Sequence, residues 1–427
     1  MERARARPAA NHAEVGQFAR VRYTISVTAP SLPRSTPPLA RTPEEWGEAL
    51  RELGVRPFHA RQLFRWIHAR GVVDASAMTD LPHELRERLA SLGLDRVLTV
   101  TDVRHARDGT SKLLARLADG ASVETVLIPG LPTALPSLPS PVAPFGGDLE
   151  DTVDDDDDDP STPSADVAGE TYVRVAQCVS TQVGCAMGCA FCASGVAGWK
   201  RHLGADEIVA QVIAGRARLQ ASERLRSVVF MGMGEPLHNY DATARAIRLL
   251  SHPDGVGLST RRITVSTSGL IPEIARLGAD FDGHIGLAVS LHAADDDTRS
   301  RLMPINTKYP LGALVAALRA YPLPRRRRIT IEYTLIAGRN DAASDATKLA
   351  RLLRGIAVKV NLIPMNPIVA SDLGPPPMTA VLAFQRILCD ADYSCFIRRR
   401  RGDDVDAACG QLALLGAPPK VRSFRDA

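Results

Sequence analysis

The chain has 427 residues, of which 45% are hydrophobic and 23% are charged, and its formal net charge is +4. That length allows one large α/β domain with smaller appendages. No run of about 18 apolar residues is present, which argues against a membrane-spanning helix, and the N-terminus lacks the apolar core of a secretory signal. Seven cysteines, three of them clustered, indicate metal or redox chemistry in a reducing compartment, so we expect a cytoplasmic protein.

The first part of the chain is predicted to contain a leader and a small helical domain. Residues 1–41 carry scattered Arg, Ala and Pro with weak periodicity, which is typical of a disordered segment. Thr42-Pro43-Glu44-Glu45 forms a capping box with Pro at the first helical position, so a helix should begin there. Helical spacing continues at 59–70 and 82–92. Residues 42–95 are therefore predicted to be a helical domain with an Arg-rich face, which either contacts nucleic acid or is simply solvated.

Residues 96–129 are predicted to add β-strands to the large domain that follows. Apolar and polar residues alternate at 112–117 and 123–128, with Gly109 and Gly120 at the turns, as in antiparallel strands. Glu124 lies between apolar residues of one strand, and a Glu in that position usually faces water.

Residues 130–169 interrupt this pattern. The segment is rich in Pro and then in Asp, so it cannot form a core and is predicted to be a disordered insertion. Residues 148–159 include nine acidic side chains and no Lys or Arg, and without them the formal net charge would be +13 instead of +4. This basic remainder, with Arg runs at 325–328 and 398–401, indicates a phosphate-rich partner or a solvated surface.

Strands and helices alternate between residues 170 and 415, before a short tail at 416–427. This order is typical of repeated βα units, and we predict an α/β fold with a partial (βα)6-type barrel. Functional residues of such barrels gather at the carboxyl ends of the strands. The expected strands are 172–179, 227–231, 262–266, 285–291, 329–335, 358–363 and 394–398, with helices near 205–220, 242–251, 271–277, 343–354 and 379–390.

Cys185, Cys189 and Cys192 follow the first of these strands with C-x3-C-x2-C spacing. Three thiolates on one loop can hold three irons of a 4Fe–4S cluster and leave the fourth iron open for a small ligand. Structural zinc is the alternative. Zinc sites normally close with four ligands, however, and the sequence has no second C-x2-C pair and no His pair at zinc spacing.

The other strand ends carry Gly and small polar residues. One strand ends in G-M-G-E-P, where Gly234 allows close approach of a ligand and Glu235 can accept a hydrogen bond from an ammonium group. Ser266, the run Ser290-Leu291-His292, and Asn366 follow other strands. His292 could be a metal ligand or a base, although a lone His at a strand end is more often a hydrogen-bonding residue.

Four cysteines lie outside the cluster motif. Cys389 and Cys395 have apolar neighbours, so we expect both in the core. Cys178 lies within the strand that precedes the cysteine loop. Cys409 lies in a polar stretch flanked by Gly, which suits a mobile loop that carries a reactive thiol.

Together these motifs resemble the RlmN/Cfr family of radical S-adenosylmethionine (SAM) methyltransferases, which methylate an adenine of large-subunit ribosomal RNA. The resemblance extends over about residues 42–412 apart from the insertion. The matching stretches are PFHARQLFRWI (57–67), VETVLIP (123–129), CVSTQVGCAMGCAFC (178–192), FMGMGEPL (230–237), STSG (266–269), SLHA (290–293), MPIN (303–306), NLIPMNP (361–367) and RGDDVDAACGQL (401–412).

The resemblance implies a role for each matched residue. Cys185, Cys189 and Cys192 would hold a 4Fe–4S cluster. Cys409 would be methylated and carry the methyl group to RNA, Cys178 would release the product through a transient disulfide with Cys409, and Glu124 would accept a proton. The residues expected to contact SAM are Gly234, Glu235, Ser266, Ser290, Leu291, His292 and Asn366.

The resemblance also implies partners. The substrate would be ribosomal RNA, with transfer RNA as a further candidate, and carbon 2 of adenine is favoured over carbon 8. The enzyme would be a monomer that takes electrons from a donor such as flavodoxin or ferredoxin. Two alternatives remain open: a radical SAM enzyme for a small molecule or peptide, which would not need Cys178 or Cys409, and a non-catalytic iron–sulfur protein that binds RNA.

Overall fold

The computed structural model of the chain describes residues 36–412, with the exception of 53, 131–171, 369–370 and 399. Most of the predicted leader, almost all of the predicted insertion and the whole predicted tail therefore lie outside the described residues. None of the helices in this part of the chain has the length and apolarity that a membrane span requires.

Helices near the start of the described chain pack around large apolar side chains. Helix α1 (Pro43–Glu52) begins at the predicted capping box, where the Thr42 N–H donates to Glu45 Oε2 (2.9 Å) and the Glu45 N–H donates to Thr42 Oγ1 (3.4 Å). Helix α2 (His59–Phe64) continues as a π-helical turn at Arg65–Ala69, and α3 spans His83–Ser91. Fully buried side chains of this region include Trp46, Leu50, Leu63, Phe64 and Ile67.

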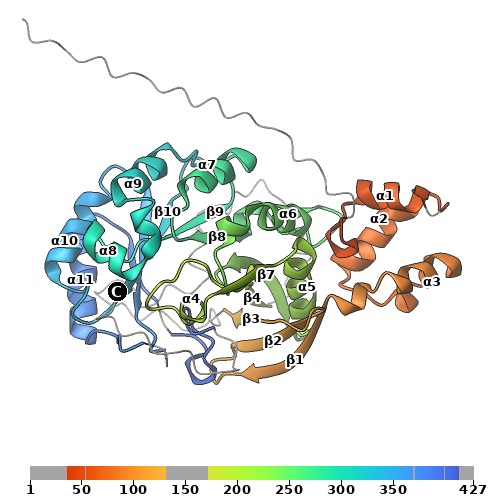
Figure 1. Cartoon of the computed structure of the whole chain (residues 1–427), viewed down its shortest axis with the longest axis horizontal. Helices are drawn as coiled ribbons and strands as arrows, with labels where there is room; N and C mark the ends of the chain where they lie inside the picture. The colour runs from red at the N-terminus through yellow and green to blue at the C-terminus, as the bar shows by residue number, and fades with distance from the viewer. Residues whose placement is uncertain (1–35, 53, 131–171, 369–370, 399, 413–427) are drawn as a thin grey trace, which may run out of the picture. The chain divides into compact units, whose positions relative to one another are not determined.

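A 10-stranded sheet forms the body of the protein, with its strands in the order β1-β2-β3-β4-β7-β8-β9-β10-β11-β12 (Figure 1). Its first three strands are antiparallel, as predicted, and comprise β1 (Leu98–His105), β2 (Ser111–Leu117) and β3 (Ser122–Pro129). The remaining strands are parallel to one another, which confirms the partial barrel. They are β4 (Val173–Cys178), β7 (Glu223–Phe230), β8 (Ile263–Thr267), β9 (Gly286–Ser290), β10 (Ile329–Leu335), β11 (Val358–Pro364) and β12 (Cys395–Ile397).

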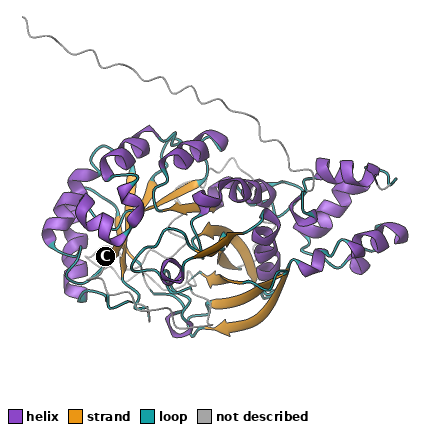
Figure 2. Ribbon diagram, viewed as in Figure 1, coloured by secondary structure: helices purple, strands orange, loops and turns teal. Residues whose placement is uncertain are grey.

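Helices lie around the outside of the parallel strands (Figure 2). Most of them follow a strand in the predicted βα alternation: α5 (Ala205–Arg216), α6 (Tyr240–Ser251), α7 (Ile271–Asp280), α10 (Ala343–Leu352) and α11 (Met378–Asp390). Two helices between β9 and β10 were not predicted. These are α8 (Asp296–Leu302) and α9 (Leu311–Ala320).

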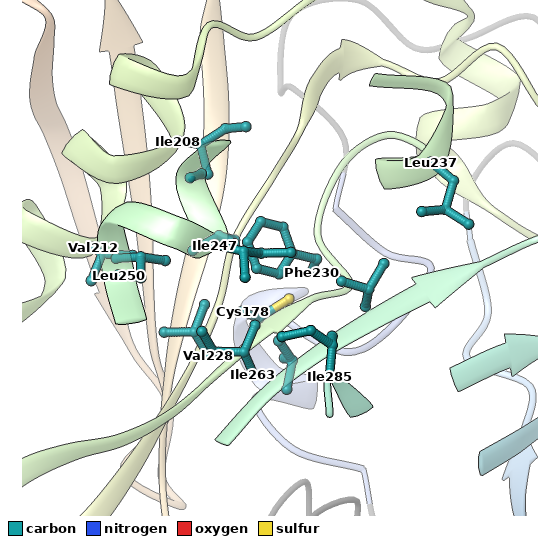
Figure 3. Packing of buried hydrophobic residues seen from close by; sticks show 14 of the residues in the cluster. Cys178, Ile208, Val212, Val228, Phe230, Leu237, Ile247, Leu250, Ile263 and Ile285 are labelled. Atoms are coloured by element: carbon teal, nitrogen blue, oxygen red, sulfur yellow. The ribbon is translucent and has the colours of Figure 1, made fainter. Parts of the chain in front are cut away.

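The core fills the space between the sheet and these helices. Side chains of β7 and β8 pack with side chains of α5 and α6, and burial of each is worth about 1.5–3 kcal/mol relative to exposure. Figure 3 labels members of the larger buried cluster to which these side chains belong, including Cys178 of β4: Cys178, Ile208, Val212, Val228, Phe230, Leu237, Ile247, Leu250, Ile263 and Ile285. Cys395 is buried as expected, but the expectation for Cys389 is wrong, because α11 turns Leu388 inward and leaves Cys389 exposed.

A short hairpin outside the main sheet holds the cysteine loop. Strand β5 (Gln182–Gly184) pairs with β6 (Trp199–His202) in antiparallel fashion. The backbone φ angle of Gly184 is +76°, and a Cβ atom there would lie 1.8 Å from the carbonyl oxygen of Gly198. Only glycine tolerates both this positive φ angle and this close approach, because it has no Cβ atom. The hairpin therefore fixes the two ends of the segment that contains the clustered cysteines.

Candidate active site

The three clustered cysteines lie on a loop that leads from β5 into the short helix α4 (Ala193–Ala197). All three line one cavity of about 910 Å³, together with residues from the carboxyl ends of the parallel strands. The Ala190 N–H donates to the Leu302 carbonyl (3.0 Å), and α4 approaches the loop so closely that a Cβ atom at Gly195 would lie 2.9 Å from Cys189 N. The loop is therefore packed in place from both sides.

The electrostatics of this loop fit a bound metal cluster. Burial raises the pKa of Cys185 to about 12 and that of Cys189 well above its usual value, and the neighbouring Cys192 adds to both shifts. As thiolates the three side chains would repel one another, and iron would remove that repulsion. In the part of the chain that the structure describes, no three His, Cys, Asp or Glu side chains converge on a single ion. Three thiols on one loop fit a cluster, in which each thiolate binds a different iron.

Glu235 joins the ends of two strands at the cavity. Its side chain is buried, and its two oxygens accept hydrogen bonds from the backbone N–H groups of Leu237 (3.1 Å) and Ser268 (2.8 Å). Burial raises the pKa of this carboxyl. Each oxygen keeps a second lone pair, so the expected contact with an ammonium group remains available. At Gly234 a Cβ atom would lie 2.5 Å from Gln182 Cβ, which leaves no room for another residue.

The other residues expected to contact SAM fall into two groups. Ser266, Ser290, His292 and Asn366 line the same cavity as the cysteines, whereas Leu291 is fully buried in the core. His292 Nδ1 accepts a hydrogen bond from the Thr334 N–H (2.8 Å), and burial lowers the pKa of His292 to about 3. A neutral, hydrogen-bonded imidazole agrees with the expectation that a lone His at a strand end forms hydrogen bonds.

Arg299 of α8 is a buried residue of the site that no sequence motif indicated. Its guanidinium donates to the backbone carbonyls of Ser268 (2.7 Å), Ser290 (3.1 Å) and Leu291 (3.0 Å). Arg299 thereby ties the end of β8 to the end of β9. The Asp- and Arg-rich sequence of α8 has the composition of a solvated helix, so only the tertiary contacts reveal this role.

Cys409 lines two cavities at once. One is the cavity of the cysteine loop, and the other, of about 530 Å³, is also lined by Cys178 and by Arg398, Arg400 and Arg401. Burial raises the pKa of Cys178 to about 12; the Cys409 thiol adds to this shift and the Arg398 guanidinium opposes it. The structure thus brings Cys178, Cys409 and the cluster cysteines together. Cys409 lies between Cys178 and the cluster cysteines, because it lines both cavities.

The segment 402–412, which carries Cys409, is anchored to its surroundings, although a mobile loop was expected. Asn366 Nδ2 donates to the Cys409 carbonyl (3.0 Å), and the Ala193 N–H donates to the Gly410 carbonyl (2.8 Å). These bonds connect the segment to the residues after β11 and to α4. They hold Cys409 beside the cysteine loop.

Glu124 does not face water, so that expectation is wrong. Its side chain is only 2% exposed, and its Oε1 lies 3.2 Å from Lys112 Nζ on β2. Val126 pairs with Cys178 across β3 and β4, which places Glu124 and Cys178 on the same face of the sheet. Segment 402–412 covers this face through a bond from Lys112 to Asp406, and so a position that alternation marks as exposed is buried. Glu124 lines neither of the two cavities.

Comparison with known proteins decides the family. A model of the radical SAM superfamily matches residues 179–350, and a model of the ribosomal RNA large subunit methyltransferase N-terminal domain matches residues 42–93. A dual-specificity RNA methyltransferase RlmN from Sorangium cellulosum is 67% identical, over 91% of this chain and 99% of the relative. The chain belongs to the RlmN family of radical SAM RNA methyltransferases.

Further relatives support the same family. A dual-specificity RNA methyltransferase RlmN from Syntrophobacter fumaroxidans is 44% identical over 86% of this chain and 94% of the relative. The crystal structure of a radical SAM methyltransferase from Sphaerobacter thermophilus matches with a TM-score of 0.75 and 42% identity, over 88% of this chain and 99% of that one. As an RlmN-family enzyme, this protein uses a 4Fe–4S cluster and SAM, and the non-catalytic alternative is set aside.

Proposed function

We propose that this RlmN-family enzyme methylates carbon 2 of an adenine in 23S ribosomal RNA and in transfer RNA, with Cys409 as the methyl carrier. The observation that carries the proposal is that Cys409 lines both the cavity of the cysteine loop and the cavity of Cys178. The two RNA classes are supported by the family model at residues 42–93 and by the words "dual-specificity" in the names of the relatives. Carbon 2, rather than carbon 8, is the position that we propose for the methyl group.

The chemistry of adenine explains the need for a carrier thiol. Ring carbons 2 and 8 are not nucleophilic, so direct polar transfer of a methyl group from SAM to either of them would fail. A cysteine thiolate, in contrast, readily accepts a methyl group by nucleophilic displacement. The 4Fe–4S cluster and SAM, when bound, supply the radical chemistry that activates the methyl group. Cys409 could both accept the methyl group and deliver it after activation, because it adjoins the cysteine loop and the second cavity.

Cys178 is assigned to product release. Once the methyl-derived carbon is bonded to adenine, the Cys178 thiolate would attack the Cys409 sulfur. An S–S bond forms, the C–S bond breaks, and its electron pair goes to the carbon, which takes up a proton and becomes the new methyl group. Two electrons must then reduce the disulfide before the next turnover. Both sulfurs line one cavity, and the Arg398 guanidinium interacts with each of them.

Glu124 is assigned as the acceptor of the ring proton that adenine loses when its aromaticity is restored. Support comes from the sheet register, which places Glu124 on the face that also carries Cys178. In this structure Lys112 lies against the carboxylate and connects it to segment 402–412.

The N-terminal helices are assigned to RNA binding. Phe58 exposes 61% of its surface beside His59, and an exposed aromatic ring is suited to stacking on an unpaired base. Arg61 and Arg65 both pair with Asp254, so part of their charge is used within the protein.

We expect a cytoplasmic monomer that takes electrons from flavodoxin or ferredoxin.

Mass mapping of ribosomal and transfer RNA tests this function. RNA from cells that contain the protein should carry a 2-methyladenine that is absent when Cys409→Ala is the only copy. The purified variant should still assemble its cluster and cleave SAM reductively, which separates loss of the carrier from loss of the cofactor site. Methylated RNA in cells with Cys409→Ala would overturn the carrier role, whereas a methyl group on carbon 8 would overturn only the position.

A further inference from the structure

The hairpin formed by β1 and β2 is hydrogen-bonded to the segment that carries Cys409. The Gly402 N–H donates to Asp108 Oδ2 (3.0 Å), and the Arg107 N–H donates to Asp404 Oδ2 (3.2 Å). The contact is tight, since a Cβ atom at Gly402 would lie 3.0 Å from Thr110 Cγ2. Residues almost 300 positions apart in the sequence are therefore held together at the start of the thiol-bearing segment.

Lys112 of β2 makes the most buried of these contacts between the hairpin and segment 402–412. Its ammonium lies 3.2 Å from Glu124 Oε1 and also donates to the Asp406 carbonyl (3.1 Å). The Lys112 side chain is only 5% exposed and that of Glu124 only 2%. A charge at this depth is costly unless a partner of opposite sign remains beside it. One ammonium thus bridges the carboxylate of β3 and the backbone of segment 402–412.

The strand register places this bridge beside the reacting thiols. Lys112 pairs with Val126 across β2 and β3, and Val126 pairs with Cys178 across β3 and β4. Directly paired residues point to the same face of a sheet, and so do residues two apart along a strand. Lys112, Glu124 and Cys178 therefore share one face, and segment 402–412 lies over it.

We propose that Lys112 is a positioning residue for the proton-transfer step: its ammonium holds the Glu124 carboxylate and fixes it relative to the segment that carries Cys409. The inference rests on the proposed function, because it takes Glu124 as the acceptor of the ring proton. In that step the C–H bond of the radical adduct breaks, its electron pair stays in the ring, and the proton passes to the Glu124 carboxylate, while the one electron in excess would return to the oxidised 4Fe–4S cluster. Without the ammonium, the contact that holds the carboxylate against segment 402–412 is lost, and the carboxylate is no longer held in the geometry that proton transfer needs.

If Lys112 and Glu124 formed an ion pair with only a structural role, the expected effect of losing Lys112 would be different. Its loss would loosen the fold and slow methyl transfer to Cys409 and methyl transfer to RNA alike. A positioning role confines the loss to the steps after Cys409 has been methylated. It also predicts that Lys112 has no further effect once Glu124 has lost its charge, because the lysine acts through the carboxylate.

The test compares Lys112→Met, Glu124→Gln and the double variant in cluster-loaded enzyme with SAM and an RNA substrate. Arg116→Met is the matched control, because Arg116 lies on the same face of β2 but is exposed. We expect Lys112→Met to methylate its own Cys409 within about twofold of wild type and to methylate RNA about a hundredfold more slowly. The double variant should be no slower than Glu124→Gln, and Lys112→Arg should recover part of the rate.

Hydrogen–deuterium exchange supplies a readout that does not depend on turnover. Lys112→Met should raise exchange in residues 402–412, whereas Arg116→Met should leave it unchanged. Unchanged exchange in Lys112→Met, equal losses in both methyl transfers, or additive losses in the double variant would each overturn the inference. A fully active Glu124→Gln would instead remove Glu124 from the proposed function and the positioning role with it, while the carrier role of Cys409 would stand.

Discussion

Asn366 Nδ2 donates a hydrogen bond to the backbone carbonyl of Cys409 at 3.0 Å. The bond connects the residue that follows β11 at the cavity edge to the thiol-bearing segment, so a residue expected to contact SAM also holds the proposed methyl carrier. Asn366 lines the cavity of Cys178 as well. Positions of the cofactor and of the carrier are thereby linked through one side chain.

Asn366→Ala should uncouple these two positions. The lost bond is worth about 1 kcal/mol, and misplacement of the thiol adds to that cost, so we expect RNA methylation to fall at least about tenfold. Cluster content, measured by visible absorbance and iron analysis, should stay at the wild-type level because Asn366 is not a cluster ligand. An Asn366→Ala enzyme with the wild-type rate would show that Cys409 needs no support from this side chain.

Cys178→Ala should trap the enzyme on its RNA. Without the second thiol nothing attacks the Cys409 sulfur, so the bond between the methylene carbon and that sulfur persists. We expect a covalent protein–RNA species on denaturing gels, and peptide mass spectrometry should find the added nucleotide on Cys409. The control is Cys395→Ala, since Cys395 lies near α11 and outside both cavities. Release of methylated RNA at the normal rate by Cys178→Ala would contradict the release role.

His68 should make stability depend on pH. Burial, aided by His252 and Arg216, lowers the pKa of His68 from 6.5 to about 3, and neither ring nitrogen has a hydrogen-bond partner among the described residues. The unfolded chain therefore binds a proton that the folded chain excludes. Stability is fully present above pH 6.5 and is lost as the pH falls toward 3, by at most about 1.4 kcal/mol per pH unit.

His68→Phe should flatten this dependence, because phenylalanine keeps the contact with Phe64 and has no proton to gain. Urea unfolding of the two proteins at pH 5 and pH 7 measures the difference. His83→Gln is the control, since His83 has a 75% exposed side chain and should leave the dependence as in wild type. An equal loss of stability between pH 7 and pH 5 in wild type and His68→Phe would refute the assignment.

Deletion of residues 131–168 should leave the fold and the activity nearly intact. Strands β3 and β4 pair in antiparallel fashion up to Pro129 and Val175, and the Gly130 N–H donates to the Arg174 carbonyl (2.7 Å). The two ends of the deleted stretch are therefore close enough for a short hairpin connection. We expect a melting temperature within a few degrees of wild type and RNA methylation within a few-fold. A folded but inactive deletion variant would assign the acidic stretch a role in the reaction.

The features that local sequence determines were predicted well. The start of α1 at Pro43 follows from a capping box within four residues, and the parallel strands follow from the regular alternation of strands and helices. The cysteine loop and the Gly- and Ser-bearing strand ends were also placed correctly, because a parallel sheet brings all carboxyl strand ends to one edge.

The errors have a common cause in contacts between distant parts of the chain. Glu124 is buried by a segment almost 300 residues further along, and no window of local sequence contains that information. Arg299 has charged neighbours in its own helix, yet it is buried by carbonyls from β8 and β9. The Leu291 side chain lies in the core and its carbonyl accepts a hydrogen bond from Arg299, while its expected contact with SAM stays a prediction.

Neighbouring strands in the main sheet also follow one another along the chain, but the segment around Cys409 returns from the far end to lie against the first hairpin. During synthesis, the cysteine loop and the strand ends around it would emerge from the ribosome long before residue 409. A nascent chain that ends before residue 409 would thus possess the cysteine loop while lacking the sulfur that we propose as the methyl carrier. If Cys409 is the carrier, RNA modification must wait until this residue has been synthesised and its segment has packed against the first hairpin.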